Sequence, residues 1–361
     1  MKKSVITLAL VLVIALLTGC AGTPVVYYTN CTCPTGSHTE TTPIETAPVL
    51  TTDPVAEGAV KTGVAIVASA AESKSAGDAD GEAKYDVTVV AVTVDDNGVI
   101  TDCVIDSIGT SVLFDVSGAI VSDLSAEILT KNELGDNYNM KLYGGAVAEW
   151  YEQAAALASY AVGKTVNELK AGAVGETGYA QDADLATSAT IYLGGYVSAI
   201  EVAVAEAEHL GAQAGDELKL GITTSVGSSK SADAENAGTA QLDVDAVALT
   251  MKDGVITSAQ IDSLQGKVTF DATGTITGGN DGYFATKNQL GEQYGMVAWG
   301  GAIAEWDAQA ASFCAYITGK TPADVSGIAV NEGTKPVDAD LSTSVTIAIG
   351  GFQALIAKAC N

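Results

Sequence analysis

Two matching runs of hydroxyl-bearing residues are the part of this sequence best suited to chemistry. Residues 182–191 read DADLATSATI and residues 338–347 read DADLSTSVTI, and an apolar stretch with helical spacing follows each run. Thr190 and Thr346 therefore hold the same place, at the expected beginning of a helix. A helix N-terminus offers free N–H groups and a partial positive charge. The two hydroxyls are thus candidate sites for a phosphate ester.

Both runs resemble the attachment motif of the FMN-binding domain family, which occurs in subunits of ion-pumping NADH oxidoreductases and in surface flavolipoproteins. Family members carry Asp, two residues, Ser or Thr, Gly, Ala, and then Ser or Thr. A flavin transferase esterifies FMN through its phosphate to the last hydroxyl. The resemblance implies covalent FMN on Thr190, on Thr346 or on both. The matching positions are Asp184, Thr187, Ala189 and Thr190 in the first run and Asp340, Thr343 and Thr346 in the second.

The two runs depart from the family pattern where it has glycine, because Ser188 and Ser344 stand there. Glycine suits a positive φ or a close approach of another group to the backbone. Val345 also replaces the family's alanine, so we expect the second run to be modified less readily than the first. The alternative is that these Thr and Ser residues only cap the following helix.

Four repeated aromatic residues could stack on an isoalloxazine ring. They are Trp150 with Trp306 and Tyr160 with Tyr316, and each pair lies on a stretch with helical spacing. Aromatic residues on a helix face more often pack in a core, which is the alternative for all four.

Composition limits the other function classes. The chain has 44 acidic and 17 basic residues and a net charge of −27, which argues against nucleic acid or bare anionic lipid as a partner. No nucleophile with a base, paired-carboxylate site or metal cluster is recognisable. We therefore expect no turnover by the chain alone.

The beginning of the chain predicts a lipoprotein. Lys2 and Lys3 precede an apolar segment over residues 5–17, and the sequence LTGC then ends at Cys20. This pattern is typical of a signal peptide of residues 1–20 that is removed before Cys20 is lipidated. The lipid would hold the protein on the extracytoplasmic face of the cell membrane.

The other cysteines suggest no shared chemistry. Cys31 and Cys33 lie too close together for an unstrained disulfide between them, and a metal site with His38 has no second ligand pair. Cys103, Cys314 and Cys360 have no cysteine in the other copy, and we interpret the last two as small buried side chains.

The remainder of the chain is a tether followed by a duplication. Residues 21–58 are rich in Thr, Pro, Ser and Glu, which is typical of a disordered segment. Matching segments then recur at an offset of 156 residues. We predict that this offset is constant along the whole duplication, without a gap. We expect two copies of one domain, residues 59–210 and 214–361, that fold independently.

Each copy should have an α+β fold, a small antiparallel sheet packed with helices. In the first copy we expect an apolar strand over 64–70, then a hairpin of strands 85–92 and 99–108 with a two-residue Asn-Gly turn. A third strand is expected near 112–114, and helices over about 146–162, from Thr165, and over about 191–206. In the second copy Pro322 marks the short middle helix and the last helix reaches the chain end.

Three hypotheses for function follow. The first is a surface lipoprotein that carries one or two FMN groups, receives them from a flavin transferase and exchanges electrons with redox partners at the cell surface. The second is a non-catalytic envelope or binding module that has lost the flavin. The third is a sensor or adhesin.

Overall fold

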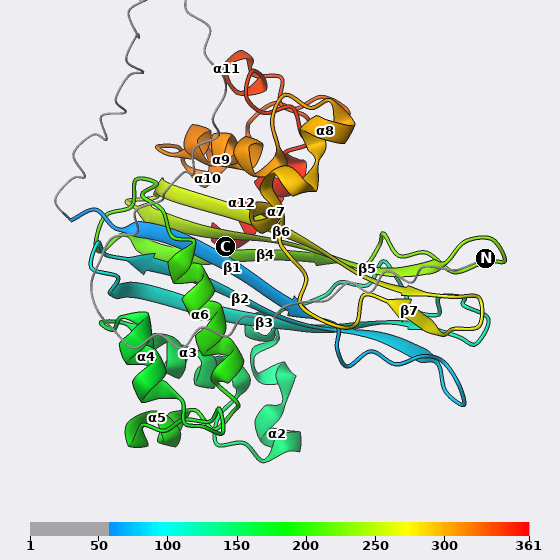
Figure 1. The fold of residues 1–361 in the computed structure, drawn as a ribbon. Coiled ribbons are helices and arrows are strands. Elements are labelled where there is room, and N and C mark those ends of the chain that lie inside the picture. The colour runs from blue at the N-terminus through cyan, green and yellow to red at the C-terminus, as the bar shows by residue number, and fades with distance from the viewer. Residues whose placement is uncertain (1–57, 361) are drawn as a thin grey trace, which may run out of the picture. The chain divides into compact units, whose positions relative to one another are not determined.

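The computed structural model describes residues 58–360, and these residues belong to one compact unit. Cys20, the signal peptide and nearly all of the predicted tether lie outside the described residues. The described part has the predicted α+β fold, with two antiparallel sheets and two matching sets of helices (Figure 1). No helix within residues 58–360 is both long enough and apolar enough to cross a membrane.

Each copy contributes one sheet whose strands follow chain order. The first sheet contains β1 (Lys61–Ser69), β2 (Gly81–Val94) and β3 (Ile100–Phe114). The second sheet contains β4 (Glu217–Ser225), β5 (Gly238–Lys252), β6 (Val255–Phe270) and the short β7 (Ile276–Gly278).

The helices of the two copies correspond one to one. The first copy has α1 (Lys131–Leu134), the 3₁₀ turn η1 (Gly135–Tyr138), α2 (Met140–Gly144), α3 (Trp150–Ala161), α4 (Val166–Ala173), α5 (Ala183–Ser188) and α6 (Gly194–Ala205). The second copy has α7 (Lys287–Leu290), η2 (Gly291–Tyr294), α8 (Met296–Gly300), α9 (Trp306–Ile317), α10 (Pro322–Ser326), α11 (Ala339–Ser342) and α12 (Gly350–Cys360).

The elements form four layers, with the two sheets inside and helices on both outer faces (Figure 1). Residues of β2 explain why: Val87 and Val89 pack into the core between the sheets, whereas Val90 and Val92 pack beneath the helices. A strand that is buried on both faces needs a nearly continuous apolar sequence, as residues 87–94 have. The copies therefore share their central core, which argues against the expected independent folding of each copy.

The two copies contact one another through pairs of equivalent residues, related by a local two-fold axis, at the end of the sheets that contains Phe114 and Phe270. Phe114 and Phe270 stack face to face, with ring centroids 4.0 Å apart and planes at 2°. The Ala76 amide donates to the Gly274 carbonyl, and the Ala232 amide donates to the Gly118 carbonyl, both at 2.8 Å. Reciprocal contacts of this kind are the pattern of an isologous interface within one chain.

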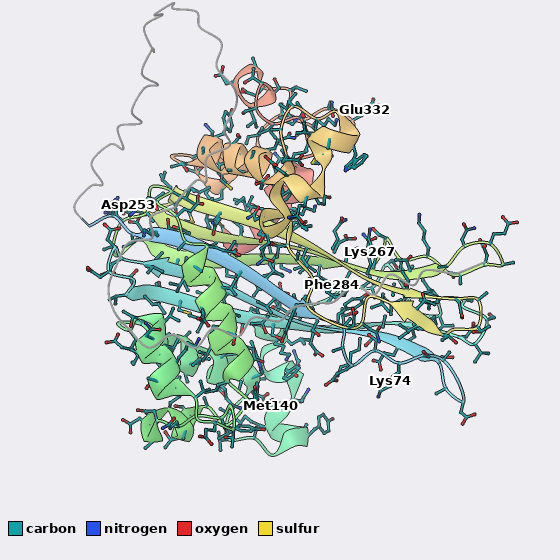
Figure 2. All side chains as sticks on the ribbon, viewed as in Figure 1. Lys74, Met140, Asp253, Lys267, Phe284 and Glu332 are labelled. Atoms are coloured by element: carbon teal, nitrogen blue, oxygen red, sulfur yellow. The ribbon has the colours of Figure 1, made fainter. Side chains whose placement is uncertain are left out.

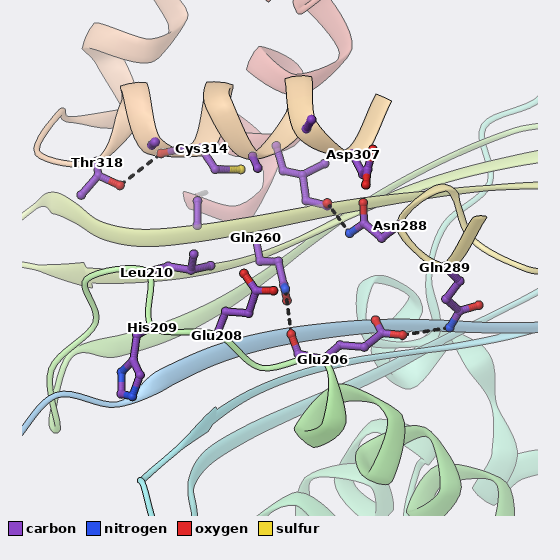
Figure 3. A pocket seen from close by; sticks show the side chains of 15 residues that line it. Glu206, Glu208, His209, Leu210, Gln260, Asn288, Gln289, Asp307, Cys314 and Thr318 are labelled. Atoms are coloured by element: carbon purple, nitrogen blue, oxygen red, sulfur yellow. Dashed lines mark hydrogen bonds between the residues drawn. The ribbon is translucent and has the colours of Figure 1, made fainter. Parts of the chain in front are cut away.

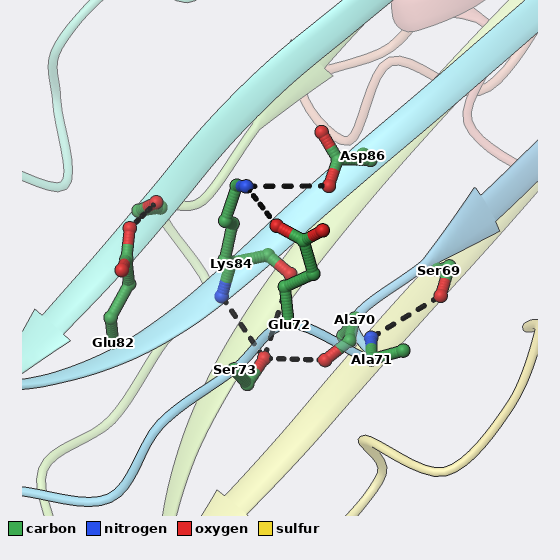
Figure 4. A network of polar contacts seen from close by, with 9 residues as sticks. Ser69, Ala70, Ala71, Glu72, Ser73, Glu82, Lys84 and Asp86 are labelled. Atoms are coloured by element: carbon green, nitrogen blue, oxygen red, sulfur yellow. Dashed lines mark hydrogen bonds and ion pairs between the residues drawn. The ribbon is translucent and has the colours of Figure 1, made fainter. Parts of the chain in front are cut away.

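The repeated Ser-Lys-Ser-Ala segment has a structural role in this interface. The Ser75 hydroxyl accepts from the Ile276 amide and the Ser231 hydroxyl accepts from the Ile120 amide, both at 2.9 Å. Nearby, the Ser73 hydroxyl accepts from the Lys84 amide at 3.0 Å, and the Lys84 ammonium contacts Glu72 (Figure 4). The repeat thus fixes the loop after the first strand of each copy and clasps it to the other copy.

The two-residue hairpin turn that the sequence predicted in the first copy is absent there, whereas the second copy has a turn of this type. A two-residue turn of this type requires positive φ at both residues. Asp253 and Gly254 meet this requirement with φ of 50° and 80°, whereas in the first copy only Gly98 of the turn has positive φ. There the Asp95 carboxylate closes a longer turn by accepting from the amides of Asn97 and Val99, both at 2.8 Å.

The offset of 156 residues is therefore not constant. Gly81 pairs with Phe114 and Gly238 pairs with Phe270, so β2 and β5 are offset by 238 − 81 = 157 residues. Relative to the first copy, the second copy has one more residue before β5 and one fewer in the tighter turn between β5 and β6. The predicted third strand near 112–114 is the end of the long β3, and β1 completes the sheet instead.

Candidate functional site

The predicted attachment residue Thr190 lies between two helices, not at the beginning of one. The preceding helix, α5, is capped by Asp182, whose carboxylate accepts from the amides of Asp184 at 2.9 Å and Leu185 at 3.0 Å. The following helix, α6, begins at Gly194, three residues later than expected. Thr190 caps neither helix, so N-capping does not explain its repetition in the second copy.

The backbone does not require glycine at the two positions where serine replaces the glycine of the family pattern. Within residues 58–360, positive φ at a residue other than glycine occurs only at Asn139, Asp253 and Thr334. Ser188 is the last residue of α5, and its hydroxyl contacts the Asp184 carbonyl at 3.3 Å. Serine at this position therefore adopts an ordinary backbone conformation and adds no strain.

The amide side chain of Gln153 holds the segment that carries Thr190. This residue of α3 is wholly buried, and its Oε1 accepts from the Thr190 amide at 2.7 Å, the Thr190 hydroxyl at 3.2 Å and the Ile191 amide at 3.1 Å. Its Nε2 donates to the Ala148 carbonyl at 2.8 Å. A buried amide with these partners fixes the loop, because leaving any of them unpaired would be costly.

The same arrangement recurs in the second copy. Gln309 is wholly buried, its Oε1 accepts from the amide of Thr346 at 2.8 Å and from its hydroxyl at 3.2 Å, and its Nε2 donates to the Ala304 carbonyl. Sequence reasoning missed both glutamines. The available signal was a polar residue repeated at the same place on an otherwise apolar helix face.

The other predicted motif residues lie on the exposed turn of the short helix. The Thr187 hydroxyl donates to the Asp184 carbonyl at 2.7 Å, and the Thr343 hydroxyl donates to the Asp340 carbonyl at 2.9 Å. These four side chains are exposed, and none lines the cavity described next. The structure therefore separates Asp184 and Thr187, which shape α5, from Thr190.

Thr190 borders a cavity of about 460 Å³ with largely aromatic walls. Trp150 forms one wall and its indole N–H donates to the Tyr196 hydroxyl at 3.0 Å. Gly195, in the first turn of α6, also lines the cavity, as does Met140 at the beginning of α2 (Figure 2). The full lining is Thr88, Lys131, Tyr138, Met140, Trp150, Tyr179, Thr190, Ile191, Tyr192, Gly195 and Tyr196.

The other aromatic candidate, Tyr160, is not part of this cavity. It lies at the end of α3, where the Lys164 ammonium sits 3.9 Å from the centre of its ring. Tyr316 has the same place in the second copy, with Lys320 at 4.3 Å. Of the four aromatic residues that the sequence suggested, Trp150 is thus the one that lines the cavity beside Thr190. Trp150 and Trp306 are both buried in the cores beneath the helices, as the alternative of core packing predicted.

The second copy has lost most of the aromatic walls. By the offset of 156 residues, Lys335, Ala348 and Phe352 take the places of Tyr179, Tyr192 and Tyr196. Trp306 and Tyr294 remain, and Phe352 packs edge-on against Trp306 at 5.8 Å. Thr346 is half-buried, whereas Thr190 is exposed.

A further cavity, of about 600 Å³, lies between α9 and residues 206–210 (Figure 3). Its polar lining includes the carboxyl groups of Glu206, Glu208 and Asp307, and no lysine or arginine reaches it. Burial raises the pKa of Glu206. This electrostatic environment disfavours a phosphate, so the cavity is a poor site for FMN.

The cysteines of the described part are free thiols. Cys314 lines the cavity of Figure 3, and burial raises its pKa to about 12. Burial also raises the pKa of the Cys103 thiol. Thiols with raised pKa values are poor nucleophiles and metal ligands, so both act as small apolar side chains. Cys360 is half-buried, and its Sγ contacts the Met251 Sδ at 3.6 Å.

Comparison of the chain with protein-family models, with curated proteins and with solved structures found no match. Within residues 58–360, no group of three or more His, Cys, Asp or Glu side chains could hold a metal ion.

Proposed function

We propose that this chain is a lipid-anchored carrier of covalently bound FMN, which transfers electrons at the extracytoplasmic face of the cell envelope. The flavin is attached through its phosphate to Thr190. Anchoring through Cys20 and the supply of FMN by a flavin transferase are parts of the same proposal. Redox partners at the cell surface would exchange electrons with the flavin.

The observation that carries the proposal is the place of the Thr190 hydroxyl. Thr190 is an exposed residue, and it borders the aromatic cavity of about 460 Å³. Small-molecule sites typically enclose about 300–1,000 Å³ and have apolar walls with a few polar groups. A hydroxyl of this kind meets the needs of a flavin, because attachment requires access and the ring system requires a flat apolar environment.

The residues around Thr190 fit FMN in their chemistry. Tyr179 and Tyr192, which are exposed at the cavity, offer aromatic surface to the ring system, and the first turn of α6, at Gly195, offers free N–H groups to a phosphate. Gln153 fixes the segment that carries Thr190. The cofactor would supply the electron-transfer chemistry, while these residues bind it, orient it and exclude water.

Attachment is a transfer of the FMN phosphoryl group from a flavin dinucleotide held by the transferase. The Thr190 Oγ1 forms a bond to phosphorus, the phosphoanhydride bond to the leaving nucleoside monophosphate breaks, and the leaving phosphate takes up the hydroxyl proton. The hydroxyl first gives up its hydrogen bond of 3.2 Å to Gln153, while the two amides keep that residue bound. We do not assign FMN to Thr346, because the second copy lacks three of the aromatic residues of the first.

Coexpression with a matching flavin transferase tests the proposal. The protein should be yellow, and its flavin fluorescence should persist in denaturant because the bond is covalent. Its mass should increase by one FMN less one water. Thr190→Val should abolish the increase, whereas the matched control Thr346→Val should leave it unchanged.

Colourless, unmodified protein from this experiment would overturn the proposal and leave a non-catalytic envelope module. Folding of each variant is checked by circular dichroism, since valine keeps the shape of threonine but cannot bond to the glutamine oxygen. Loss of that one hydrogen bond should cost about 1 kcal/mol.

A further inference from the structure

Each copy places a lysine over two aromatic rings. The Lys131 ammonium lies 5.1 Å from the ring centre of Trp150 and 5.2 Å from that of Tyr138. The Lys287 ammonium lies 4.7 Å and 5.3 Å from the equivalent rings of the second copy. Lys131 and Lys287 are each the first residue of a short capped helix. The position is thus defined by helix geometry and cation–π contacts in both copies.

The charges around the two lysines differ. Thr88, which lines the Thr190 cavity, is replaced by Asp245 at the equivalent position of β5. Asp86 contacts the Lys84 ammonium at 3.8 Å. In the second copy Asp243 corresponds to Asp86, and the neutral Gln241 takes the place of Lys84. The first replacement makes the surroundings of Lys131 one charge more positive than those of Lys287. The second is offset, because Glu72, which pairs with Lys84, is replaced by Ser228.

Two other charged replacements are balanced or screened. Glu133, beside Lys131, forms an ion pair of 2.7 Å with Lys358. Lys335, in the place of Tyr179, is exposed, so water screens its charge. In the second copy burial lowers the pKa of Lys287, and the charges of Asp245 and Asp243 oppose that shift. The charge of Lys287 is therefore compensated by protein carboxylates.

We propose that Lys131 is the residue by which the first copy recognises the anionic group of its ligand, and that Asp245 removes this ability from the second copy. The ligand class is a planar aromatic ring system that bears a phosphate. This inference rests on the proposed function, because it names the chemical basis on which the Thr190 cavity selects FMN.

The reasoning is electrostatic. Lys131 is half-buried at the cavity wall, and among residues 58–360 it forms no ion pair. An ammonium in partly desolvated surroundings attracts a phosphate more strongly than one in bulk water. Asp245 instead places a negative charge where the second copy would receive that phosphate. The two copies have thus diverged in charge while they retain the same backbone.

Equilibrium binding of free FMN and of riboflavin to the unmodified protein tests the inference without any transferase. The two ligands share the ring and differ by the phosphate, so the ratio of their dissociation constants isolates anion recognition. Quenching of flavin fluorescence reports both affinities. The first copy should prefer FMN by roughly tenfold or more, as expected for a hydrogen bond between charged groups. The preference should decrease with added salt.

Matched variants assign the preference to one lysine. Lys131→Met should abolish it by weakening the binding of FMN far more than that of riboflavin, because methionine keeps the apolar stem. Lys287→Met should change neither affinity. Thr88→Asp should copy the effect of Lys131→Met.

An unchanged preference in Lys131→Met, or equal affinity of the unaltered protein for the two flavins, would overturn the inference. Absence of binding by both flavins would do the same. If FMN is nevertheless found covalently bound to Thr190, any of these three results would overturn only the inference about Lys131 and leave the proposed function standing. Conversely, a Lys131-dependent preference for FMN in protein that the transferase never modifies would support anion recognition and refute covalent attachment.

Discussion

Asp262 provides a sharp test of the energetics of the shared fold. It lies wholly buried on β6, and its Oδ1 accepts from the Ser263 amide at 2.7 Å and the Asn288 amide at 3.1 Å. Its Oδ2 has no hydrogen-bond partner among the described residues. Burial raises the pKa of Asp262 to about 6 from 3.8. The substitution Asp262→Asn keeps the accepting oxygen and removes the charge.

The size of the effect follows from the difference in pKa. A shift from 3.8 to about 6 is worth about 3 kcal/mol at about 1.4 kcal/mol per pH unit. Because the folded state binds the proton more tightly than the unfolded state, ionisation of Asp262 lowers the free energy of unfolding. That cost is fully present above pH 6 and disappears as the pH falls towards 3.8. The free energy of unfolding of Asp262→Asn, relative to the unaltered chain, should therefore be about 3 kcal/mol higher at pH 7 than near pH 4. The asparagine NH2 adds a cost that does not depend on pH, because it lies where Oδ2 has no partner.

Urea unfolding of the chain and the variant at several pH values measures this difference. Comparison at each pH cancels the contributions of all other carboxyl groups. Asp106 is the equivalent residue of β3, and burial raises its pKa too, so Asp106→Asn should show the same sign of effect. A stability difference between Asp262→Asn and the unaltered chain that does not increase between pH 4 and pH 7 would refute the reasoning.

Three further predictions concern the loop, the core and the anchor. Gln153→Met removes three accepted hydrogen bonds and one donated bond, so the free energy of unfolding in urea should decrease by about 2–4 kcal/mol. Gln309 accepts only two such bonds, so Gln309→Met should decrease it less. Equal stability of both variants and the unaltered chain would contradict the role of the glutamine. Because the two sheets share a core, residues 59–210 and 214–361 should each fail to melt cooperatively alone in calorimetry, and independent melting would show that the core is dispensable. Cys20→Ala should release the protein from membranes in fractionation, and unchanged lipid labelling would disprove the lipoprotein.

Local patterns in the sequence predicted much of the secondary structure. The short middle helix begins after Thr165 in the first copy and at Pro322 in the second, as expected. Thr165 forms a capping box with Glu168 and Thr321 caps the other helix, and both caps depend on neighbouring residues alone. The pairing of the two sheets was not predicted. Residues 87–94 are apolar on both faces of the strand, which signals burial on both sides, but a strand pattern does not say which other surface covers it.

The candidate site was predicted in part. The repeat drew attention to Thr190, and the structure adds the cavity beside it. Gln153 escaped notice because its contacts join α3 to the loop after α5, 37 residues further along the chain. Lys131 escaped notice because its place over two aromatic rings depends on how η1 and α3 pack against α1. The cap by Asp182 was hidden among several acidic and hydroxyl residues that could each have capped a helix.

The most direct test of covalent FMN on Thr190 is peptide mapping after coexpression with the native organism's flavin transferase. Trypsin separates the two candidate residues, because Lys219 and Lys320 lie between them. Mass spectrometry should find FMN on the peptide that contains Thr190 and none on the peptide that contains Thr346. Modification of Thr346 alone, or of neither peptide, would contradict the account.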